Sequence, residues 1–184
     1  GTPMTEPMIT QMARANSQRS TLEAALHGDV FTPDDDGYRG SCAGFNLAAA
    51  HRPDVVVAAA GAVDVATAIR YAADADLTVR VQATGHGPGG PVDGGMLVNT
   101  RALQRVSVDP ERRTAHVAAG VRWTDVIQAA APHGLAPLNG SSVTVGVVGY
   151  TLGGGMGPMA RTFGFAADHV RRIEMVTATG DLVR

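Results

Sequence analysis

The most regular hydrophobic pattern in the chain lies between residues 54 and 81. Asp54 to Ala60 is a run dominated by valine and alanine, and its β-branched residues are typical of a buried strand. Apolar residues then recur at helical spacing through residues 62–75, and Leu77 to Val81 forms a second β-branched run. This pattern predicts a strand, a helix and a second strand that form a βαβ unit with a right-handed crossover.

Shorter elements are predicted after this unit. Three further runs have the composition of short strands: Met96–Asn99, Val106–Val108 and Thr114–Ala119. Trp123 to Ala131 predicts a helix, with Thr124 as its N-cap and Gly134 beyond its end. Arg172 to Thr177, a Gly180-Asp181 turn and Leu182 to Arg184 predict the start of a hairpin. Because a domain rarely leaves a strand edge unpaired, we expect further polypeptide or another chain to complete this sheet.

The first 38 residues carry weaker patterns. Met8 to Arg19 is interpreted as a short helix or a frayed arm, and Thr21 to His27 predicts a short helix that ends at Gly28. Phe31 to Tyr38 contains three successive aspartates and predicts a loop. We therefore divide the chain into an N-terminal arm with a short helix (1–28), a first subdomain (29–102) and a second, incomplete subdomain (103–184).

Glycine is clustered in two places. Of the 23 glycines, six lie in residues 85–95 and seven in residues 140–157. Glycine costs backbone entropy, so such clusters indicate unusual backbone angles or a close approach of the backbone to a ligand.

The first cluster follows the run that ends at Val81. It reads Gln82-Ala83-Thr84-Gly85-His86-Gly87-Pro88-Gly89-Gly90. A loop of small residues that leaves a strand can direct successive N–H groups into one concavity, which binds anions such as phosphate. The glycines have the spacing of the dinucleotide fingerprint, but Pro88 lacks an N–H and no helical period follows. No Gly-Lys-Ser/Thr sequence is present, which excludes a P-loop.

His86 stands within this loop, and four roles are open to it: a turn-capping side chain, a metal ligand, a general base or a covalent tether. The other histidines lack metal-ligand spacing, so we expect no metal site. A general base is chemically reasonable because imidazole titrates near neutral pH.

The second cluster runs from Asn139 to Gly157 and contains three successive glycines. A glycine-rich hairpin and a flexible linker are the structural alternatives to a ligand-binding loop. β-Branched and aromatic residues flank these glycines, which argues against a linker.

Together the two loops resemble the FAD-binding half of the vanillyl-alcohol oxidase superfamily, specifically its berberine-bridge-enzyme-like branch. The family pattern is a strand, a small-residue loop ending in Gly-His and, further on, the stretch Gly-x-Cys-Pro-x-Val-Gly-x-x-Gly-x-x-x-Gly-Gly-Gly-x-Gly. Gly140 to Gly157 follows the glycine spacing of that stretch, and the resemblance covers roughly residues 30–184. It implies an α+β, PCMH-type FAD-binding fold, in which a small βαβ-containing subdomain packs against a second, mixed α/β subdomain.

The resemblance also implies a cofactor site. The FAD diphosphate would be bound by the backbone N–H groups of Ala83, Thr84, Gly85, His86 and Gly87. His86 would be bonded covalently to the 8α-methyl carbon of the flavin. The flavin would be lined by Ser142, Val145, Gly146, Gly149, Tyr150, Gly153, Gly154 and Gly155, and Val176 would approach the adenine through its backbone.

The sequence departs from the family pattern at the second loop. Members with two covalent bonds carry cysteine where this chain has Ser142, so we expect a single bond, through His86. Val143 stands at the usual proline. Cys42, the only cysteine, lies outside the motif and is expected to pack as a small buried hydrophobe.

A catalytic base cannot be assigned to this chain. The tyrosine that often serves as base in the family would lie beyond residue 184, as would the substrate-binding domain. Tyr38 follows the aspartate-rich turn that in the family precedes a strand, Tyr71 fits the apolar side of a helix, and Tyr150 is expected near the flavin. None of the three is expected to be the base.

Three functions are compatible with these patterns. The first is the FAD-binding part of an oxidoreductase that oxidises an alcohol, sugar, alkaloid or other secondary metabolite by hydride transfer to the flavin, with O2 as reoxidant. The second is an FAD-binding module without turnover of its own, completed by another chain. The third is an α/β domain whose glycine loops are only structural.

The composition of the chain excludes several classes of binding partner. Fifteen basic and 17 acidic residues give a formal charge of −2 and a pI near 6.3, which argues against a nucleic-acid partner. No apolar run is long enough for a transmembrane helix, so no membrane partner is expected. A single cysteine excludes an intrachain disulfide framework. No secretory signal pattern opens the chain, so we expect a cytoplasmic protein.

Overall fold

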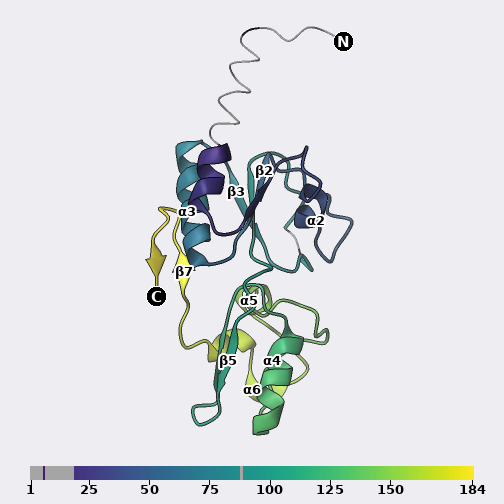
Figure 1. The fold of residues 1–184 in the computed structure, drawn as a ribbon. Helices are drawn as coiled ribbons and strands as arrows, with labels where there is room; N and C mark the ends of the chain where they lie inside the picture. Colours follow the sequence, from purple (N-terminus) through teal and green to yellow (C-terminus); the bar gives the residue numbers. More distant parts are fainter. Residues whose placement is uncertain (1–5, 7–18, 88) are drawn as a thin grey trace.

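The computed structural model describes residue 6, residues 19–87 and residues 89–184. Except for Arg19, the predicted Met8–Arg19 element lies outside the described residues. The chain folds into a unit built on a four-stranded sheet and a second unit built on a two-stranded sheet with short helices, while a C-terminal hairpin lies beside helix α3 (Figure 1). No helix of the described residues is both long and apolar enough to cross a membrane.

The predicted strand–helix–strand unit is confirmed as β2 (Val55–Ala58), α3 (Ala62–Asp74) and β3 (Val79–Gln82). β2 and β3 are not neighbours, because β4 (Met96–Asn99) lies between them and pairs in parallel with both. The sheet order is β1-β2-β4-β3. β1 (Asp29–Phe31), which the sequence pattern does not predict, pairs antiparallel with β2.

The two central strands are buried on both faces, as parallel strands covered by helices usually are. Side chains alternate between the faces of a strand, so Val55 and Val57 contribute to one apolar cluster while Val56 contributes to another. The first cluster includes Ala68 and Ala72 of α3 together with Leu22, Met96 and Val98. The second lies on the opposite face and contains Tyr38, Cys42 and Leu97. The expected burial of Cys42 is confirmed, because its exposed fraction is 5 %.

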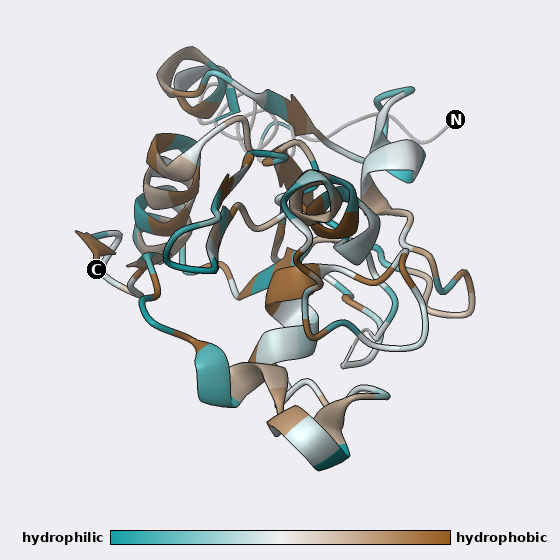
Figure 2. Ribbon diagram, turned by 90° about the horizontal axis from the view of Figure 1, so that it is seen from below, coloured by the Kyte–Doolittle hydropathy of each residue, from teal (hydrophilic) through white to brown (hydrophobic). Residues whose placement is uncertain are grey.

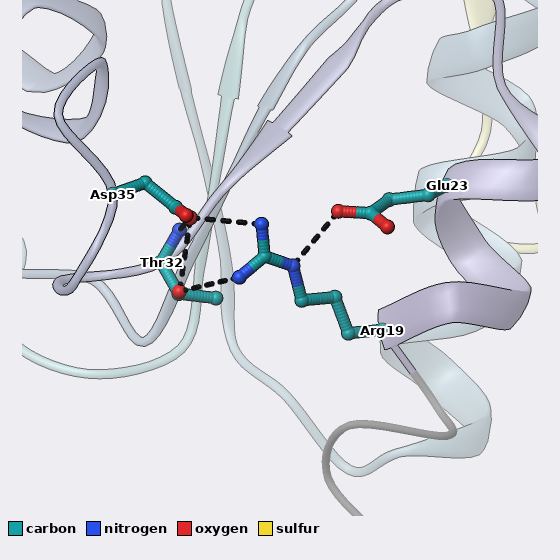
Figure 3. Close-up of polar contacts among 4 residues, drawn as sticks. All are labelled: Arg19, Glu23, Thr32 and Asp35. Carbon is teal, nitrogen blue, oxygen red and sulfur yellow. Dashed lines mark hydrogen bonds and ion pairs between the residues drawn. The ribbon is translucent and has the colours of Figure 1, made fainter.

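The carboxylates of Asp35 and Asp64 attach the N-terminal helix, residues 19–25, and the turn that follows it to this unit. Arg19 donates to Glu23 on its own helix and pairs with Asp35 in the turn after β1, where Thr32 also accepts its hydrogen bond (Figure 3). The backbone N–H of Thr32 and the Arg19 guanidinium hold the pKa of Asp35 below its ordinary value.

Asp64, in the first turn of α3, is fully buried and accepts hydrogen bonds from the backbone N–H groups of His27, Gly28 and Ala60. Burial by itself would raise the pKa of Asp64, but these three donors together lower it below its ordinary value. The carboxylate thus fixes the path of the chain into β1.

The aspartate-rich turn leads into helix α2 (Tyr38–Cys42) and not into the strand that the family pattern suggests. Tyr38 is buried against β2 and donates its phenolic hydrogen to the carbonyl of Pro53, at 2.6 Å. Burial raises the pKa of Tyr38 to about 12.

The second unit begins with the antiparallel pair β5 (Val106–Asp109) and β6 (Thr114–Val117), followed by helix α4 (Trp123–Ala130). The predicted N-cap at Thr124 is wrong: the helix is capped at Arg122, whose N–H donates to the Asp125 carboxylate. An acidic side chain three residues after the cap satisfies an N–H that the helix leaves free. The other helices are η1 (Ala131–His133), α5 (Val147–Leu152), α6 (Ala160–Phe163) and η2 (Ala166–His169).

The C-terminal hairpin of β7 (Met175–Val176) and β8 (Leu182–Val183) is confirmed, with Gly180 in its turn at a φ of 80°. It returns from the second unit to α3 of the first (Figure 1). Arg70 of α3 donates to the Gly180 carbonyl, and its side chain packs on the glycine. β8 leaves both of its apolar side chains partly exposed and is coloured brown at the C-terminus in Figure 2.

Candidate functional site

The first glycine loop follows the carboxyl end of β3, and its successive backbone N–H groups have no hydrogen-bond acceptor among the described residues. The backbone N–H groups of residues 83–87 donate no hydrogen bond to any described residue, whereas the residues of β3 just before them pair with β4. Gly85 has a φ of 69°, which favours glycine. Successive free N–H groups in such a loop are the chemistry of an anion nest.

A second segment, residues 43–46, lies directly on this loop. The Phe45 N–H donates to the Thr84 carbonyl at 2.8 Å, and the Asn46 N–H donates to the Gly85 carbonyl at 3.0 Å. The two backbones touch at Gly44, because a Cβ on Gly85 would lie 2.5 Å from the Gly44 Cα. We call residues 43–46 the strap.

The strap is held by side chains from the ends of β3 and β4. Gln82 donates to the Cys42 carbonyl at 3.1 Å, Asn99 donates to the Ser41 carbonyl at 2.8 Å, and Arg101 donates to the Ala43 carbonyl. Without these donors the carbonyls at the end of α2 would lack partners. The polar side chains at the strand ends therefore hold the strap in place on the first glycine loop.

The imidazole of His86 is held from two sides. The Phe45 ring stacks on it with centroids 3.7 Å apart and planes within 10°. On the other side, Nε2 lies 3.1 Å from the Thr144 hydroxyl, which itself lies 3.0 Å from the Ser142 hydroxyl. Three segments that are far apart in the sequence therefore converge on one histidine.

The second glycine loop contains helix α5, which the sequence analysis did not predict. The loop is tied to the second unit by hydrogen bonds from Trp123 N–H to the Val145 carbonyl and from Val147 N–H to the Val121 carbonyl. Gly146 faces the first loop, because a Cβ there would lie 3.3 Å from the Thr84 side chain. The absence of a side chain thus lets the two loops approach each other.

Tyr150 of α5 sits in a cradle of glycines. A Cβ at Gly140, Gly155 or Gly157 would lie within 2.9 Å of the tyrosine side chain. Trp123 packs edge-on against its ring, with centroids 5.5 Å apart. The phenolic oxygen is buried and has no hydrogen-bond partner among the described residues, and burial raises the pKa of Tyr150.

A cavity of about 660 Å³ opens between the two glycine loops. Gly87, Gly89, Gly90 and Gly149 line it, and a Cβ on any of them would meet nothing within 4 Å. These glycines are therefore not required by packing among the described residues; they leave bare backbone at the cavity wall. Such a wall, with free amides and an imidazole, fits a large, flat ligand that carries a diphosphate.

Most of the predicted cofactor residues share this cavity: Ala83, Thr84, Gly85, His86, Gly87, Val145, Gly146, Gly149 and Tyr150. Ser142 is outside the lining but is linked to His86 through Thr144. Gly153, Gly154 and Gly155 follow α5 and do not line the cavity, and Gly155 packs instead on Tyr150 and Ala166. Val176 lies in β7, which contacts α3.

Four residues of the site were missed by the sequence analysis: His51 and Arg80, which line the cavity, and Phe45 and Thr144, which contact His86. His51 accepts a hydrogen bond from the Val92 N–H. Arg80 forms no ion pair among the described residues, so its charge is free to act on a ligand. Thr144 could have been found because its hydroxyl stands two residues after Ser142 in the motif, whereas nothing in the sequence placed Phe45 on the histidine.

No group of three or more metal-ligating side chains occurs in residues 19–87 and 89–184.

Free amides at the end of a strand, a histidine among them and a facing glycine loop are the parts of a binding site for a cofactor that carries a diphosphate. Residues 53–184 match the FAD binding domain family, and the chain belongs to this family. The relatives of the chain belong to the vanillyl-alcohol oxidase and berberine-bridge-enzyme-like flavoproteins, which confirms the resemblance found in the sequence.

Among its relatives is the (R)-6-hydroxynicotine oxidase of Paenarthrobacter nicotinovorans, 32 % identical over 91 % of this chain and 37 % of that protein. Among solved structures, the berberine-bridge-enzyme-like protein 1 of Physcomitrella patens has a TM-score of 0.81 and 26 % identity, over 90 % of this chain and 37 % of that one. A glucooligosaccharide oxidase from Acremonium strictum, described with a 6-S-cysteinyl, 8α-N1-histidyl FAD, has a TM-score of 0.81 and 27 % identity, over 91 % of this chain and 36 % of that one. The chain spans a little over a third of the length of these proteins.

Proposed function

We propose that this chain is the FAD-binding part of an oxidoreductase whose flavin is bonded covalently to His86. The observation that carries the proposal is the position of the imidazole, which borders the cavity beside five unused backbone N–H groups. When bound, FAD would accept a hydride from an alcohol, sugar, alkaloid or related secondary metabolite and pass the electrons to O2.

The chain's own residues supply binding and orientation. The amides of residues 83–87 would donate hydrogen bonds to the diphosphate, and Arg80 would add positive charge at the same cavity. The strap keeps these amides from closing onto their own backbone, because it already occupies the Thr84 and Gly85 carbonyls. Gly146 and Gly149 admit the flavin ring close to the second loop.

One covalent bond is expected, not two. Ser142 stands where doubly linked family members carry cysteine, and a hydroxyl is a far poorer nucleophile than a thiolate. Cys42 cannot take that role, because it is buried in the core on the α2 face of the sheet and burial raises the pKa of its thiol.

The alternative is an FAD-binding module that is completed by another chain and has no turnover of its own. It is favoured by the side chains that line the cavity, none of which is an evident catalytic base. His51 accepts a hydrogen bond from the Val92 N–H, the Tyr150 hydroxyl is buried, and Arg80 and His86 are assigned to the cofactor. Anaerobic mixing with candidate substrates separates the two: bleaching of the bound flavin supports the enzyme, and its absence with every substrate supports the module.

The test of covalent attachment is intact mass after incubation with FAD, together with yellow colour that stays with acid-precipitated protein. His86→Ala is expected to abolish both signals, while exposed His116→Ala on β6 leaves them unchanged. Flavin that washes completely off the wild-type protein in acid would overturn the covalent linkage. Failure to bind FAD at all would overturn the proposal that FAD is the cofactor.

A further inference from the structure

One wall of the cavity lies on the face of the four-stranded sheet that α2 covers. Arg80 of β3 is in register with Leu97 of β4, and residues in register on neighbouring strands point to the same face of a sheet. Leu97 belongs to the apolar cluster with Tyr38 and Cys42 of α2, which identifies that face. Both Arg80 and Leu97 line the cavity. The Arg80 side chain therefore leaves the sheet on the α2 side, next to an apolar surface.

His51 lies on the same wall. Val92 belongs to the apolar cluster that contains Leu97, and the Val92 backbone N–H donates to Nδ1 of His51 at 3.0 Å. The Arg52 N–H donates to the Val92 carbonyl at 2.7 Å, which ties the two segments together. His51 and Val92 also line the cavity. Arg80 and His51 are thus joined by the apolar surface of Leu97 and Val92.

The hydrogen bond from Val92 fixes which ring nitrogen of His51 carries a proton. A ring nitrogen that accepts a hydrogen bond from an amide uses its lone pair and holds no proton, so the proton is on Nε2. Nε2 forms no hydrogen bond with any described residue. The imidazole of His51 therefore has a free N–H donor at the cavity.

The charge on this wall is positive and unpaired. The Arg80 guanidinium forms no ion pair or hydrogen bond among the described residues, and none of the described residues that line the cavity is acidic. The backbone N–H groups of Gly89 and Gly90 line the same cavity and donate to no described residue. A guanidinium, an imidazole N–H and free amides are donors that recognise the oxygens of phosphates and carboxylates.

We propose that Arg80 and His51 form a second oxyanion subsite in the cavity, distinct from the amides of residues 83–87. Its ligand is a phosphate or a carboxylate group, which accepts hydrogen bonds from the guanidinium and from the Nε2–H of the imidazole. Two sources can supply that group: the diphosphate of FAD, or the anionic group of a separate ligand such as a substrate acid. The first source rests on the proposed function, whereas the subsite itself does not.

The first experiment titrates the cofactor-free chain with inorganic phosphate. Long-range ¹H–¹⁵N spectra of the ¹⁵N-labelled chain report the His51 ring, and backbone spectra report the loop amides. We expect the ring proton on Nε2 before phosphate is added and a shift of the Nε2 signal as phosphate binds. In Arg80→Gln, the phosphate affinity read at His51 is expected to fall at least ~10-fold, because a charged hydrogen bond is lost, while the amides of Gly85 and Gly87 keep their response.

Two further variants separate the subsite from general effects. Arg105→Gln removes the same charge at an exposed position outside the cavity and is expected to leave phosphate binding unchanged. His51→Asn assigns the ring signal, keeps an acceptor for the Val92 N–H and removes the Nε2 donor. We expect its urea unfolding to match wild type and its phosphate affinity, read at the Arg80 Nε–H signal, to fall ~3- to 10-fold.

The second experiment repeats the phosphate titration with FAD bound and identifies the source of the anion. If the FAD diphosphate occupies the subsite, FAD itself shifts the His51 signal, added phosphate has no further effect, and Arg80→Gln weakens FAD binding. If the subsite takes the anion of a separate ligand, His51 still responds to phosphate in the FAD complex, and Arg80→Gln leaves FAD affinity unchanged.

A His51 ring signal that phosphate does not move would overturn the subsite. Equal phosphate affinity at His51 in Arg80→Gln and Arg105→Gln would overturn it as well. Loss of the Gly85 and Gly87 responses in Arg80→Gln would show a single anion site in place of two. A chain that binds phosphate at His51 but never binds FAD would instead overturn the proposed function and leave the subsite standing.

Discussion

The ring of Phe45 lies flat on the imidazole of His86, with their centroids 3.7 Å apart, although the two residues are separated by the first two parallel strands and helix α3. Phe45 is 64 % exposed, and His86 is the aromatic ring that it stacks on among the described residues. Stacking of this kind contributes roughly 0.5–1.5 kcal/mol beyond area burial, which is enough to bias a ring's orientation and too little to decide the fold.

Phe45→Ala is therefore expected to slow covalent flavin attachment ~3- to 10-fold with a change in unfolding free energy below about 1 kcal/mol. Leu47→Ala is the matched control, because Leu47 is 80 % exposed and follows the strap. Attachment time courses and urea unfolding of both variants test this. Equal attachment rates in the two variants would show that the stacked ring has no effect on His86.

Gly85→Ala is expected to damage both the fold and the cofactor site. The residue has a φ of 69°, and a Cβ would lie 2.5 Å from the Gly44 Cα, so the strap must move away from the loop. We expect a loss of about 2 kcal/mol or more in unfolding free energy, with weaker FAD binding. Gly87→Ala is the control, because its Cβ meets nothing within 4 Å and its φ is not in the left-handed region. A Gly85→Ala protein as stable as the Gly87→Ala protein would contradict the close approach of the strap.

Asp64 is expected to make the fold sensitive to acid. Its pKa is lowered in the folded state, so the stability that it contributes is present above the pKa of the unfolded chain and is lost as pH falls through the lower, folded value. Asp64→Asn removes this contribution and leaves a buried N–H without its charged acceptor, which costs about 2–4 kcal/mol near neutral pH. The difference from wild type shrinks towards pH 3. Melting temperatures from pH 3 to pH 8 check this, with exposed Asp74→Asn on the same helix as control; a difference that does not depend on pH would be inconsistent with a titrating Asp64.

Tyr150→Phe tests the buried phenolic oxygen that has no partner among the described residues. Because no hydrogen bond is lost, we expect the unfolding free energy to stay the same or to rise by up to about 1 kcal/mol. Tyr150→Ala removes the ring that Trp123 and the glycine cradle enclose and is expected to cost about 3–5 kcal/mol. Thermal unfolding of both variants measures the two effects. A Phe variant that is clearly less stable than wild type would mean that the hydroxyl has a partner.

The strongly patterned elements could be predicted from the sequence, and the contacts between them could not. Met96–Asn99 is a strand with the predicted bounds because a short apolar run that follows two glycines allows few alternatives. Helix α5 escaped prediction because Gly149 and its neighbouring glycines are poor helix formers, so the helix depends on Tyr150 packing into the second unit. β1 has only three residues, and its pairing with β2 is a tertiary contact without a local signal.

The same division holds for the candidate site. His86 and its amides could be predicted, because glycine, histidine and strand end lie within a few residues of one another. Phe45 and Arg80 could not, since nothing near them in the sequence indicates which segment folds across the loop or which strand lies at the edge of the sheet. Thr144 lay inside the motif, but its register relative to the histidine depends on how the second unit docks.

The return of the C-terminal hairpin to α3 gives the second unit a further attachment to the first, at Arg70 and Gly180, besides the chain that leaves β4 and the contact of Thr144 with His86. Because these contacts are separated in space, they restrict rotation of the second unit relative to the first. The spacing between the histidine loop and the loop that carries Thr144 is consequently a property of the whole chain, and a substitution on the far side of α3 can alter the width of the cleft without touching it.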